Sequence, residues 1–483
     1  MRLGLDFWSV FSLIFLVTAI PVAIMIILER RSPFKTAAWV LALILLPVFG
    51  VVFYLFFGQE YRKKKLFSRK GLKSLNRYRQ LSFRQLRQFE QSLQKLSPKV
   101  REKENIVRLL LKNSSALLTT GNKLKILNNA KETFEAIFSA IENARHHIHL
   151  EYYILEDDKI GNQLTDLLIK KSNEGVEIRI IVDDVGSWGL KQKFLNRLRQ
   201  NRIEIYSFME VRFPRLTSRV NYRNHRKIVV VDGKIGFTGG INFADRYLKG
   251  VKEIGPWRDT HLQIEGDAVN CLQVVFAADW YFVIQENLTG KKYFPPLSET
   301  RETPVQISAS GPDSDWDSIG QAFFAAISGA QSQIFIATPY LMPPLEIIYA
   351  LKTAALSNVD VRILMPEKSD SVIPHWSSFS YIEELLEAGV RVFFYQNGFI
   401  HSKYIIVDEV FSTVGTTNLD FRSLETNFEV NAFIYDEGFT SELEMQFKTD
   451  LKNSREIKLD EWRQRKWHFK LRESVAHLVS PLM

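Results

Sequence analysis

The side chains with the clearest chemical potential lie in two short stretches that share one spacing. The first stretch contains, in order, His225, Lys227, Asp232, Gly239 and Asn242. The second stretch places the same residue types at the same offsets, at His401, Lys403, Asp408, Gly415 and Asn418. A match over five defined positions indicates that one half of a reactive site occurs twice in the chain.

The local pattern predicts how each copy is folded. A run of apolar residues follows each histidine and lysine, which indicates a buried strand on which His225 and Lys227 project from the same face. Asp232-Gly233 is a hairpin-turn dipeptide and should return the chain toward Asn242. We therefore expect histidine, lysine and asparagine to meet at one end of a hairpin in each copy.

If the two halves pack about a pseudo-twofold axis, their side chains converge on a space the size of one anion. Lys227 and Lys403 supply compact positive charges, and the amides of Asn242 and Asn418 can donate to phosphate oxygens. Such groups stabilise the charge of a phosphodiester in its transition state. This chemistry requires no metal ion and no cofactor.

Paired histidines can perform the exchange itself. A neutral imidazole attacks phosphorus and forms a phosphohistidine, while a protonated imidazole donates to the leaving alcohol and later accepts a proton from the incoming hydroxyl. The residues do not decide whether His225 or His401 attacks. Asp259 and Glu429 are each expected to accept the far ring N–H of the histidine in their own half, the alternative being that they are surface carboxylates.

Elements that alternate between strand and helix surround both copies. From about residue 119, short β runs alternate with amphipathic helices, which is typical of an α/β fold. The same order recurs in both halves, with strands expected near 124–127, 147–154 and 176–182 and again near 305–308, 333–337 and 359–365. We predict two related domains, 119–300 and 301–483, joined by a linker within 287–303.

The N-terminal region is different in character. Residues 7–28 and 36–57 contain no charged side chain, and each run is long enough to cross a bilayer as a helix. Residues 1–60 are therefore interpreted as a transmembrane hairpin rather than a cleaved signal peptide. Basic residues near its outer ends outnumber the three between the spans, which predicts that the rest of the chain is cytoplasmic.

Two further segments are basic. Residues 61–118 are expected to form a juxtamembrane connector, either solvated or in contact with anionic lipid. The stretch from Trp462 to Leu471 is expected to close the core with a solvated basic face, with membrane contact as the alternative. The formal net charge of +9 also favours an anionic partner, and the membrane hairpin favours a bilayer surface over nucleic acid.

The single cysteine, Cys271, excludes an intrachain disulfide and is expected to be buried on a helix.

The two copies closely resemble the HxKxxxxD signature of the phospholipase D superfamily, and the whole chain resembles the bacterial cardiolipin synthases within it. The narrower resemblance rests on these segments: Arg30–Pro33, Asn221–His225, Trp257–His261, Thr338–Tyr340, Asp420–Ser423 and Asn427–Glu429. It implies condensation of two phosphatidylglycerols into cardiolipin and glycerol at the bacterial cytoplasmic (inner) membrane, by a multi-pass protein without nucleotide or metal. It also implies that His225 is the nucleophile and His401 the acid and base. Asp232 and Asp408 belong to the catalytic signature, although the resemblance implies that they mainly support the fold.

Other functions remain open from the sequence. With water as the acceptor, the same site would make a membrane-bound phospholipase D-type phosphodiesterase or a nuclease, and a hairpin anchor disfavours the nuclease. A catalytically inactive scaffold is disfavoured because both copies are intact. His146, His147 and His149 invite a metal hypothesis, but no partner with ligand spacing accompanies them. Oligomeric state, donor preference and acyl-chain selectivity cannot be predicted.

Overall fold

The computed structural model describes residues 19–28, 33–46, 49–51, 54, 80–86, 98–211, 221–295 and 303–480. The chain divides into two compact units. The smaller unit comprises Met1–Gly71 and Val211–Tyr222, and the larger comprises Leu72–Glu210 and Arg223–Met483.

In the smaller unit, the described residues include the helices Ala19–Leu28 and α2 (Pro33–Leu45). Ile26, Leu43 and Tyr54 are buried together, and many of the other large apolar side chains in these helices are exposed. The remaining parts of the predicted spans 7–28 and 36–57, the loop 29–32 and the basic residues 62–73 lie outside the described residues.

Among the described residues, one helix is long and apolar enough to cross a bilayer, α13 (Asp267–Ile284). It is mostly buried within the larger unit. Cys271 lies on this helix and is buried, as predicted.

The larger unit contains two large sheets. The first has the order β2-β9-β7-β6-β3-β4-β5, with strands β2 (Asn122–Asn128), β3 (His147–Tyr152), β4 (Glu177–Asp183), β5 (Glu204–Phe208), β6 (Ile228–Val231), β7 (Ile235–Gly239) and β9 (Thr260–Gly266). The second has the order β1-β10-β19-β17-β16-β11-β13-β14-β20, with strands β1 (Leu118–Thr119), β10 (Val305–Ser310), β11 (Gln333–Ala337), β13 (Asp360–Pro366), β14 (Arg391–Tyr395), β16 (Tyr404–Val407), β17 (Phe411–Gly415), β19 (Glu429–Tyr435) and β20 (Ser454–Ile457).

Without its edge strands β1 and β20, the second sheet has the same arrangement of strands as the first sheet. Neighbouring strands in β3-β4-β5 and in β11-β13-β14 run parallel, and the other neighbours in both sheets run antiparallel. The prediction of an α/β fold with two repeated halves is therefore confirmed.

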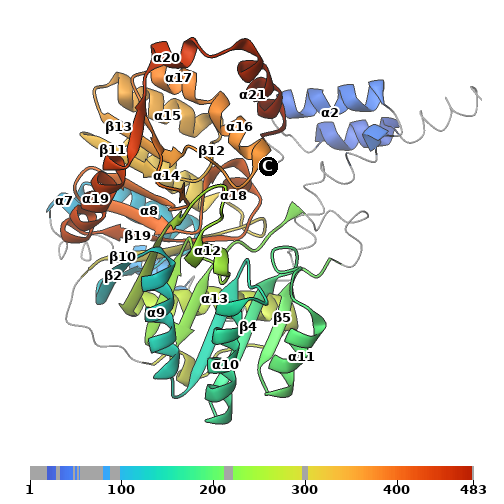
Figure 1. Cartoon of the computed structure of the whole chain (residues 1–483), viewed down its shortest axis with the longest axis vertical. Coiled ribbons are helices and arrows are strands. Elements are labelled where there is room, and N and C mark those ends of the chain that lie inside the picture. Colours follow the sequence, from blue (N-terminus) through green and yellow to red (C-terminus); the bar gives the residue numbers. More distant parts are fainter. Residues whose placement is uncertain are drawn as a thin grey trace, which may run out of the picture. The chain divides into compact units, whose positions relative to one another are not determined.

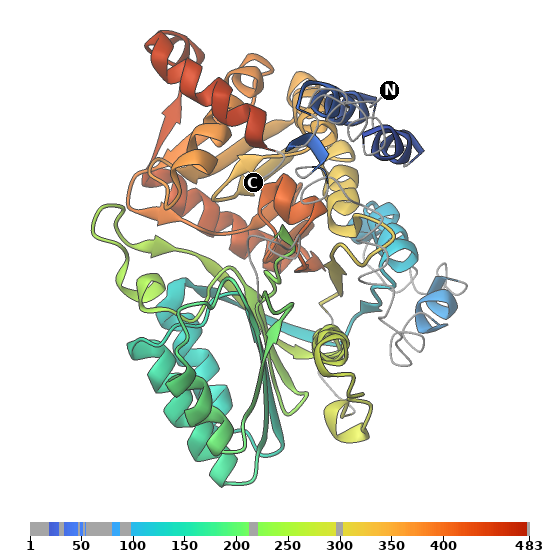
Figure 2. The same ribbon diagram turned by 90° about the vertical axis from the view of Figure 1, so that its right-hand side faces the viewer.

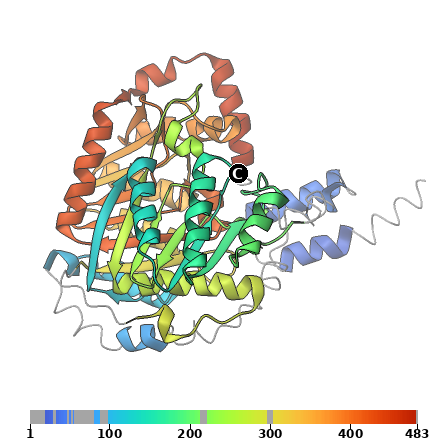
Figure 3. The same cartoon turned by 60° about the horizontal axis from the view of Figure 1, so that its bottom comes forward.

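Helices cover the outer faces of the sheets, and the inner faces meet. On the first sheet lie α9 (Asn129–Glu142), α10 (Lys159–Asn173) and α11 (Gln192–Gln200); on the second lie α14 (Ser318–Ser328), α15 (Leu345–Leu356) and α17 (Ile382–Glu387). The core between the halves combines side chains of both sheets with side chains of α13 and α19 (Glu437–Lys452). Figures 1 and 3 show α9 and α10 side by side on the first sheet, and Figure 2 shows this sheet nearly edge-on, with these helices on one face and the yellow-green α13 on the other.

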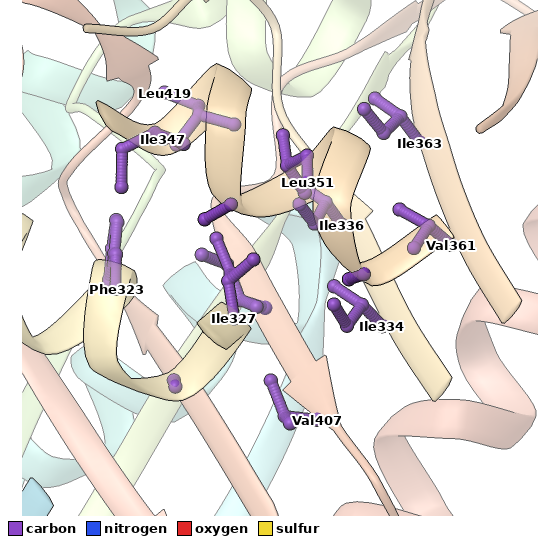
Figure 4. Close-up of a cluster of buried hydrophobic side chains, with 14 of the residues drawn as sticks. Phe323, Ile327, Ile334, Ile336, Ile347, Leu351, Val361, Ile363, Val407 and Leu419 are labelled. Atoms are coloured by element: carbon purple, nitrogen blue, oxygen red, sulfur yellow. The ribbon is translucent and has the colours of Figure 1, made fainter. Parts of the chain in front are cut away.

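Burial of apolar side chains holds these layers together. In the second half, one buried apolar cluster contains Phe323 and Ile327 of α14, Leu351 of α15, and Ile334 and Ile336 of β11 (Figure 4). These side chains are almost fully buried. Burying one such side chain contributes about 1.5–3 kcal/mol, so this cluster fixes the helices on the sheet that carries the second histidine motif.

The predicted connector 61–118 differs from expectation where it is described. Helix α8 (Glu104–Asn113) buries Ile106, Val107, Leu110 and Leu111 in the core of the second half. Its strong amphipathic spacing explains this packing, because one whole face is apolar. The end of the connector is therefore part of the second half rather than a solvated or lipid-facing segment.

Candidate active site

Each motif histidine is held in place by the backbone of the opposite half. Asn224 forms a parallel bridge with Phe428, and the His225 amide donates to Phe428 O at 2.9 Å. In the same way, β8 (Trp257–Arg258) pairs with β15 (Phe399–Ile400), and the His401 amide donates to Arg258 O at 2.7 Å. The two half-sites are thus interlocked where they meet.

Each motif histidine contacts a carboxylate that belongs to the opposite half. His225 Nδ1 lies 2.9 Å from Glu429 Oε1, and His401 Nδ1 lies 2.7 Å from Asp259 Oδ2. The prediction that Asp259 and Glu429 contact histidine rings is confirmed, but the expectation that each serves its own half is wrong. The reason is the strand exchange just described, which places each acid beside the opposite histidine.

Burial sets the protonation of these pairs. Burial lowers the pKa of His225 to about 4 although Glu429 opposes the shift, and it lowers the pKa of His401 well below its usual value. Burial also raises the pKa of Asp259 to about 6. Both imidazoles are therefore neutral near pH 7, and a ring that donates Nδ1–H to its carboxylate keeps the Nε2 lone pair for chemistry.

The motif lysines are buried next to the histidine backbones. Lys227 Nζ donates to His225 O at 2.8 Å, and Lys403 Nζ donates to His401 O at 2.5 Å. Burial lowers the pKa of Lys227 to about 7 and that of Lys403 to about 8, partly offset by the nearby carboxylates Glu429 and Asp259. An anion placed between them would restore their full charge, so this arrangement is suited to a phosphate group.

The motif asparagines lie at the same ends of the hairpins but contact other groups. Asn242 Nδ2 donates to the Tyr247 hydroxyl at 2.5 Å, and Asn242 Oδ1 accepts from the amide of Ile154 at 3.2 Å. The Tyr247 ring lies 5.8 Å from the ring of His401. Asn418 Oδ1 is buried and has no hydrogen-bond partner among the described residues. Binding of phosphate by the two asparagines stays a prediction.

The motif aspartates are engaged with backbone rather than with the histidines or lysines. Asp232 accepts from the amides that begin β3: those of Arg145, His146 and His147, at 2.9, 2.8 and 3.0 Å. Asp408 accepts from the amides of Ser332 at 2.8 Å and of Gln331 at 3.0 Å, and it pairs with Lys103 Nζ at 2.5 Å. Both aspartates adopt φ +54 in the turn after their strand. These contacts fix the start of a neighbouring strand and agree with the supporting role that the resemblance implies, and a catalytic contribution of Asp232 or Asp408 stays a prediction.

Two arginines next to the site were not predicted. Arg226 pairs with Asp279 of α13 and also donates to Glu429 O and Ser310 O, each at 3.1 Å. Arg258 donates to Asp450 of α19, with Nε 2.9 Å from Oδ1. Both pairs are buried and link the strands that carry the histidines and their acids to long helices. The available signal was Asp279, an acid within the apolar stretch of α13, whereas α19 carries several acids and Asp450 does not stand out among them.

Aromatic rings enclose the reactive groups. The Tyr153 ring lies 5.1 Å from the ring of His225, and the rings of Trp257 and Phe399 lie 6.1 and 5.7 Å from that of His401. These walls limit the access of water and raise the strength of electrostatic interactions at the site.

The histidines of the metal hypothesis lie elsewhere. His147 and His149 are buried in β3 with ring centroids 4.7 Å apart, and His149 Nδ1 contacts Gln273 Oε1 at 3.0 Å. The residues that the structure describes contain no group of three or more His, Cys, Asp or Glu side chains arranged around a common ion position.

Two copies of one sheet, with paired histidine and lysine side chains where they meet, define a double-domain site of the phospholipase D type. The family model described as "Cardiolipin synthase, PLD-like domain" matches residues 137–280 and 323–451, and the one described as "Phospholipase_D-nuclease N-terminal" matches residues 4–59.

Relatives match over nearly the full chain. Cardiolipin synthase 2 of Bacillus anthracis is 42% identical over 471 residues, which cover 97% of this chain and 91% of that protein. The cardiolipin synthase of Alkalihalophilus pseudofirmus is 42% identical over 484 residues, which cover 99% of this chain and 95% of that protein. The chain belongs to the cardiolipin synthase family.

A solved structure shares the fold. The crystal structure of phosphatidylserine synthase from Haemophilus influenzae Rd KW20 superimposes with a TM-score of 0.60 at 14% identity, covering 80% of this chain and 100% of that one. At this identity the likeness concerns the fold alone.

Proposed function

We propose that this chain is a cardiolipin synthase that transfers a phosphatidyl group from one phosphatidylglycerol to another, yielding cardiolipin and glycerol. The observation that carries the proposal is the crossed pairing of His225 with Glu429 and of His401 with Asp259. It gives two neutral imidazoles whose Nδ1 atoms are occupied and whose Nε2 atoms are available. A double-displacement reaction at phosphorus needs one neutral ring to attack and a second ring that is protonated when the substrate phosphodiester binds.

In the first step, Nε2 of His225 attacks phosphorus and the bond from phosphorus to the glycerol oxygen breaks. Protonated His401 gives its proton to that oxygen, and glycerol leaves. In the second step, His401 accepts the proton of a headgroup hydroxyl of the second phosphatidylglycerol. That oxygen attacks phosphorus, and the bond from phosphorus to His225 breaks.

The lysines support both steps. Charged Lys227 and Lys403 stabilise the negative charge on the non-bridging oxygens, which grows in each transition state. The phosphodiester anion itself favours the charged forms of the groups around it, including the imidazolium of His401. Because one phosphodiester replaces another, the reaction is close to thermoneutral and needs no activated donor. The roles of the two histidines follow the family resemblance.

A membrane-bound phosphodiesterase that uses water as the acceptor is the alternative. The aromatic rings beside both histidines favour the transferase, because they limit the access of water to a phosphohistidine. Incubation of the purified chain with phosphatidylglycerol vesicles decides between the two. Cardiolipin with an equal amount of glycerol supports the transferase, and phosphatidic acid without cardiolipin refutes it.

A single-turnover experiment with radiolabelled phosphatidylglycerol tests the roles of the histidines. His401→Ala should retain label on His225, because the base that activates the incoming hydroxyl in the second step is missing, and His225→Ala should retain none. Label on His401 in the His225→Ala variant would reverse the two roles.

The uncharged runs 7–28 and 36–57 support a multi-pass anchor, and the excess of basic residues near its outer ends supports a cytoplasmic location for the catalytic domains. In sealed inverted vesicles, protease should then cleave the chain near residue 100. Protection of this region would refute the orientation.

A further inference from the structure

The C-terminal helix of the described chain carries an unpartnered apolar face. In α21 (Trp467–Val479), the residues Trp467, Leu471, Val475 and Leu478 are spaced by four, four and three positions and therefore line one side of the helix. All four are exposed, with Trp467 at 73% and Leu478 at 78%. A solvated basic face was expected near this end of the chain. Trp462 closes the core as expected, but α21 presents an apolar face instead.

The neighbouring helix adds two more exposed apolar side chains. Helix α16 (Val372–Ser380) packs along α21, as Figure 1 shows. The Arg472 guanidinium lies 5.0 Å from the centroid of the Trp376 ring, and the Ser380 hydroxyl lies 2.9 Å from His477 Nδ1. At the start of α16, Val372 and Ile373 are also exposed. We name these six exposed residues the α16–α21 patch: Val372, Ile373, Trp467, Leu471, Val475 and Leu478.

The polar groups beside α21 suit an anionic surface. The only carboxylate in α21, Glu473, is buried, and its two oxygens accept from Arg465 at 2.8 and 2.9 Å. The exposed polar neighbours at the start of the helix are Lys466 and His468. A helix with an apolar stripe and basic flanks lies in the plane of a membrane, with its apolar face about 5–10 Å into the boundary between headgroups and acyl chains.

The patch adjoins the second half-site. Helix α16 begins two residues after Asp370, whose carboxylate accepts from the Tyr340 hydroxyl at 2.6 Å. The charge of Asp370 acts on both His401 and Lys403, which places it within electrostatic reach of the reactive groups. A surface that holds α16 against a bilayer therefore also holds the second half-site near it.

The apolar surface is concentrated in the second half. Among the described residues, twelve large hydrophobic side chains are exposed between 303 and 480, and three between 119 and 295. Scattered exposed apolar side chains are normal, but a continuous stripe on one helix with an extension on the next marks an interaction surface.

We propose that the α16–α21 patch is a membrane-docking surface that lies in the headgroup layer of an anionic phospholipid bilayer and holds the second half-site at the membrane from which lipid substrate is drawn. The proposal rests on the proposed function for its substrate. The occupant is a bilayer rather than a second copy of the chain, because the neighbouring groups are basic and the substrate lies in the membrane.

Fluorescence of the full chain in vesicles tests the docking directly. Cys271 is buried and burial raises its thiol pKa to about 12, so an added cysteine can be labelled without removing it. An environment-sensitive dye is attached to Leu471→Cys, to Leu478→Cys and to the control Met445→Cys. Met445 lies on α19 and is 61% exposed, comparable with Leu471.

In vesicles of phosphatidylcholine and phosphatidylglycerol, lipids with brominated acyl chains should quench the dyes at 471 and 478 at least about twofold more than the dye at 445. Replacing phosphatidylglycerol by phosphatidylcholine should weaken the difference. Quenching equal to that at position 445 overturns the proposal. So does a disulfide between two copies of the unlabelled Leu471→Cys protein in the absence of quenching in the labelled protein, since it would identify a second chain as the occupant.

A kinetic comparison adds a functional readout. For the variant Leu471→Glu with Leu478→Glu, turnover of bilayer phosphatidylglycerol relative to a monomeric short-chain phosphatidylglycerol should fall at least about tenfold. Met445→Glu should leave this ratio unchanged. An equal loss on both substrates overturns the docking role. If the chain released phosphatidic acid instead of cardiolipin, the proposed function would fail while the quenching result would still decide the docking.

Discussion

His401 Nδ1 lies 2.7 Å from Asp259 Oδ2, although 142 residues separate them in sequence and they belong to different halves of the larger unit. His225 and Glu429 form the matching pair in the other direction. Neither half therefore contains a complete histidine–carboxylate pair. Duplication of the domain produced one site that needs both copies in contact.

The first prediction concerns the crossed acids. Asp259→Asn and Glu429→Gln keep the size of each side chain but remove the charge that fixes the tautomer of the opposite ring. Turnover of phosphatidylglycerol should fall about 10²–10⁴-fold in each variant. Glu265→Gln, on the same strand region as Asp259 but paired with Lys123, is the matched control and should stay within about twofold of the unchanged protein. Activity near the normal level in Asp259→Asn would contradict the orienting role.

The second prediction concerns Gly240, which lies against the same carboxylate. A Cβ atom at this position would stand 2.1 Å from Asp259 Oδ1, so Gly240→Ala must displace the acid from His401. We expect a loss of turnover of at least about 100-fold, similar to that of Asp259→Asn. At Gly189 a Cβ atom meets nothing within 4 Å, so Gly189→Ala is the control and should be neutral.

Thermal unfolding of both glycine variants separates a local effect from a folding defect. A variant Gly240→Ala that is folded and fully active would show that Asp259 is not required in this position. The second copy has Thr416 in place of Gly240, and its hydroxyl donates to Glu429 Oε2 at 2.5 Å. The two acids are therefore held differently, which gives the two histidines unequal surroundings.

Local features of this fold were predictable from sequence, and contacts between distant strands were not. The hairpin at Asp232-Gly233 was predicted because its turn residues determine it locally, and the structure has β6 and β7 on either side. The repeat of β and α runs likewise indicated the two sheets. The exchange of β8 and β15 between halves depends on pairing across more than 140 residues, which no local pattern encodes.

The lack of a local signal for contacts between distant residues explains two other differences between the sequence-based expectations and the structure. The sequence near α8 is basic, but the four apolar residues on one helix face determine its packing into the second half. Lys103 and Asp408 form a buried pair across 305 residues, so neither residue alone indicates the contact. Motif spacing could show which residues matter, but not that the aspartates contact backbone rather than phosphate.

The third prediction concerns stability through Asp408. Asp408→Asn leaves Lys103 buried without a charged partner and weakens the bonds from the amides that begin β11, so it should lower the free energy of unfolding by about 3 kcal/mol. Lys103→Met should cost less, because Asp408 keeps its amide donors. Denaturant unfolding of the full chain in nanodiscs measures both, and a larger loss in Lys103→Met would contradict the assignment.

The pH dependence of this pair has a defined sign. The Lys103 ammonium and backbone amides hold the pKa of Asp408 below its usual value, despite the opposing effect of burial. The contribution of Asp408 to the free energy of unfolding is therefore complete above its pKa in the unfolded chain, about 3.9. This contribution is lost as the pH falls through the pKa of Asp408 in the folded protein. The difference in stability between the unchanged protein and Asp408→Asn should accordingly shrink below about pH 4.

The last prediction links phosphate binding to proton uptake. In the empty site the pKa of Lys227 is about 7 and that of Lys403 about 8, so both are partly neutral at pH 8. A bound phosphodiester raises both values, and binding must then take up protons. The affinity for the phosphodiester should be nearly constant below pH 7 and should fall as the pH rises through 8. The fall should end once the pH exceeds the pKa values of the two lysines in the complex.

Calorimetry with glycerophosphoglycerol in two buffers of different ionisation enthalpy measures the uptake. This soluble phosphodiester does not titrate near neutral pH, so the protons taken up belong to the protein. At pH 8.5 the two lysines should together contribute an uptake approaching two protons, because most of each lysine is neutral before binding. Lys227→Met should remove about one proton of this uptake and weaken binding, while the control Lys234→Met, in the exposed turn after β6, should change neither. Binding without proton uptake at pH 8.5 would mean that the two buried lysines do not hold the phosphate.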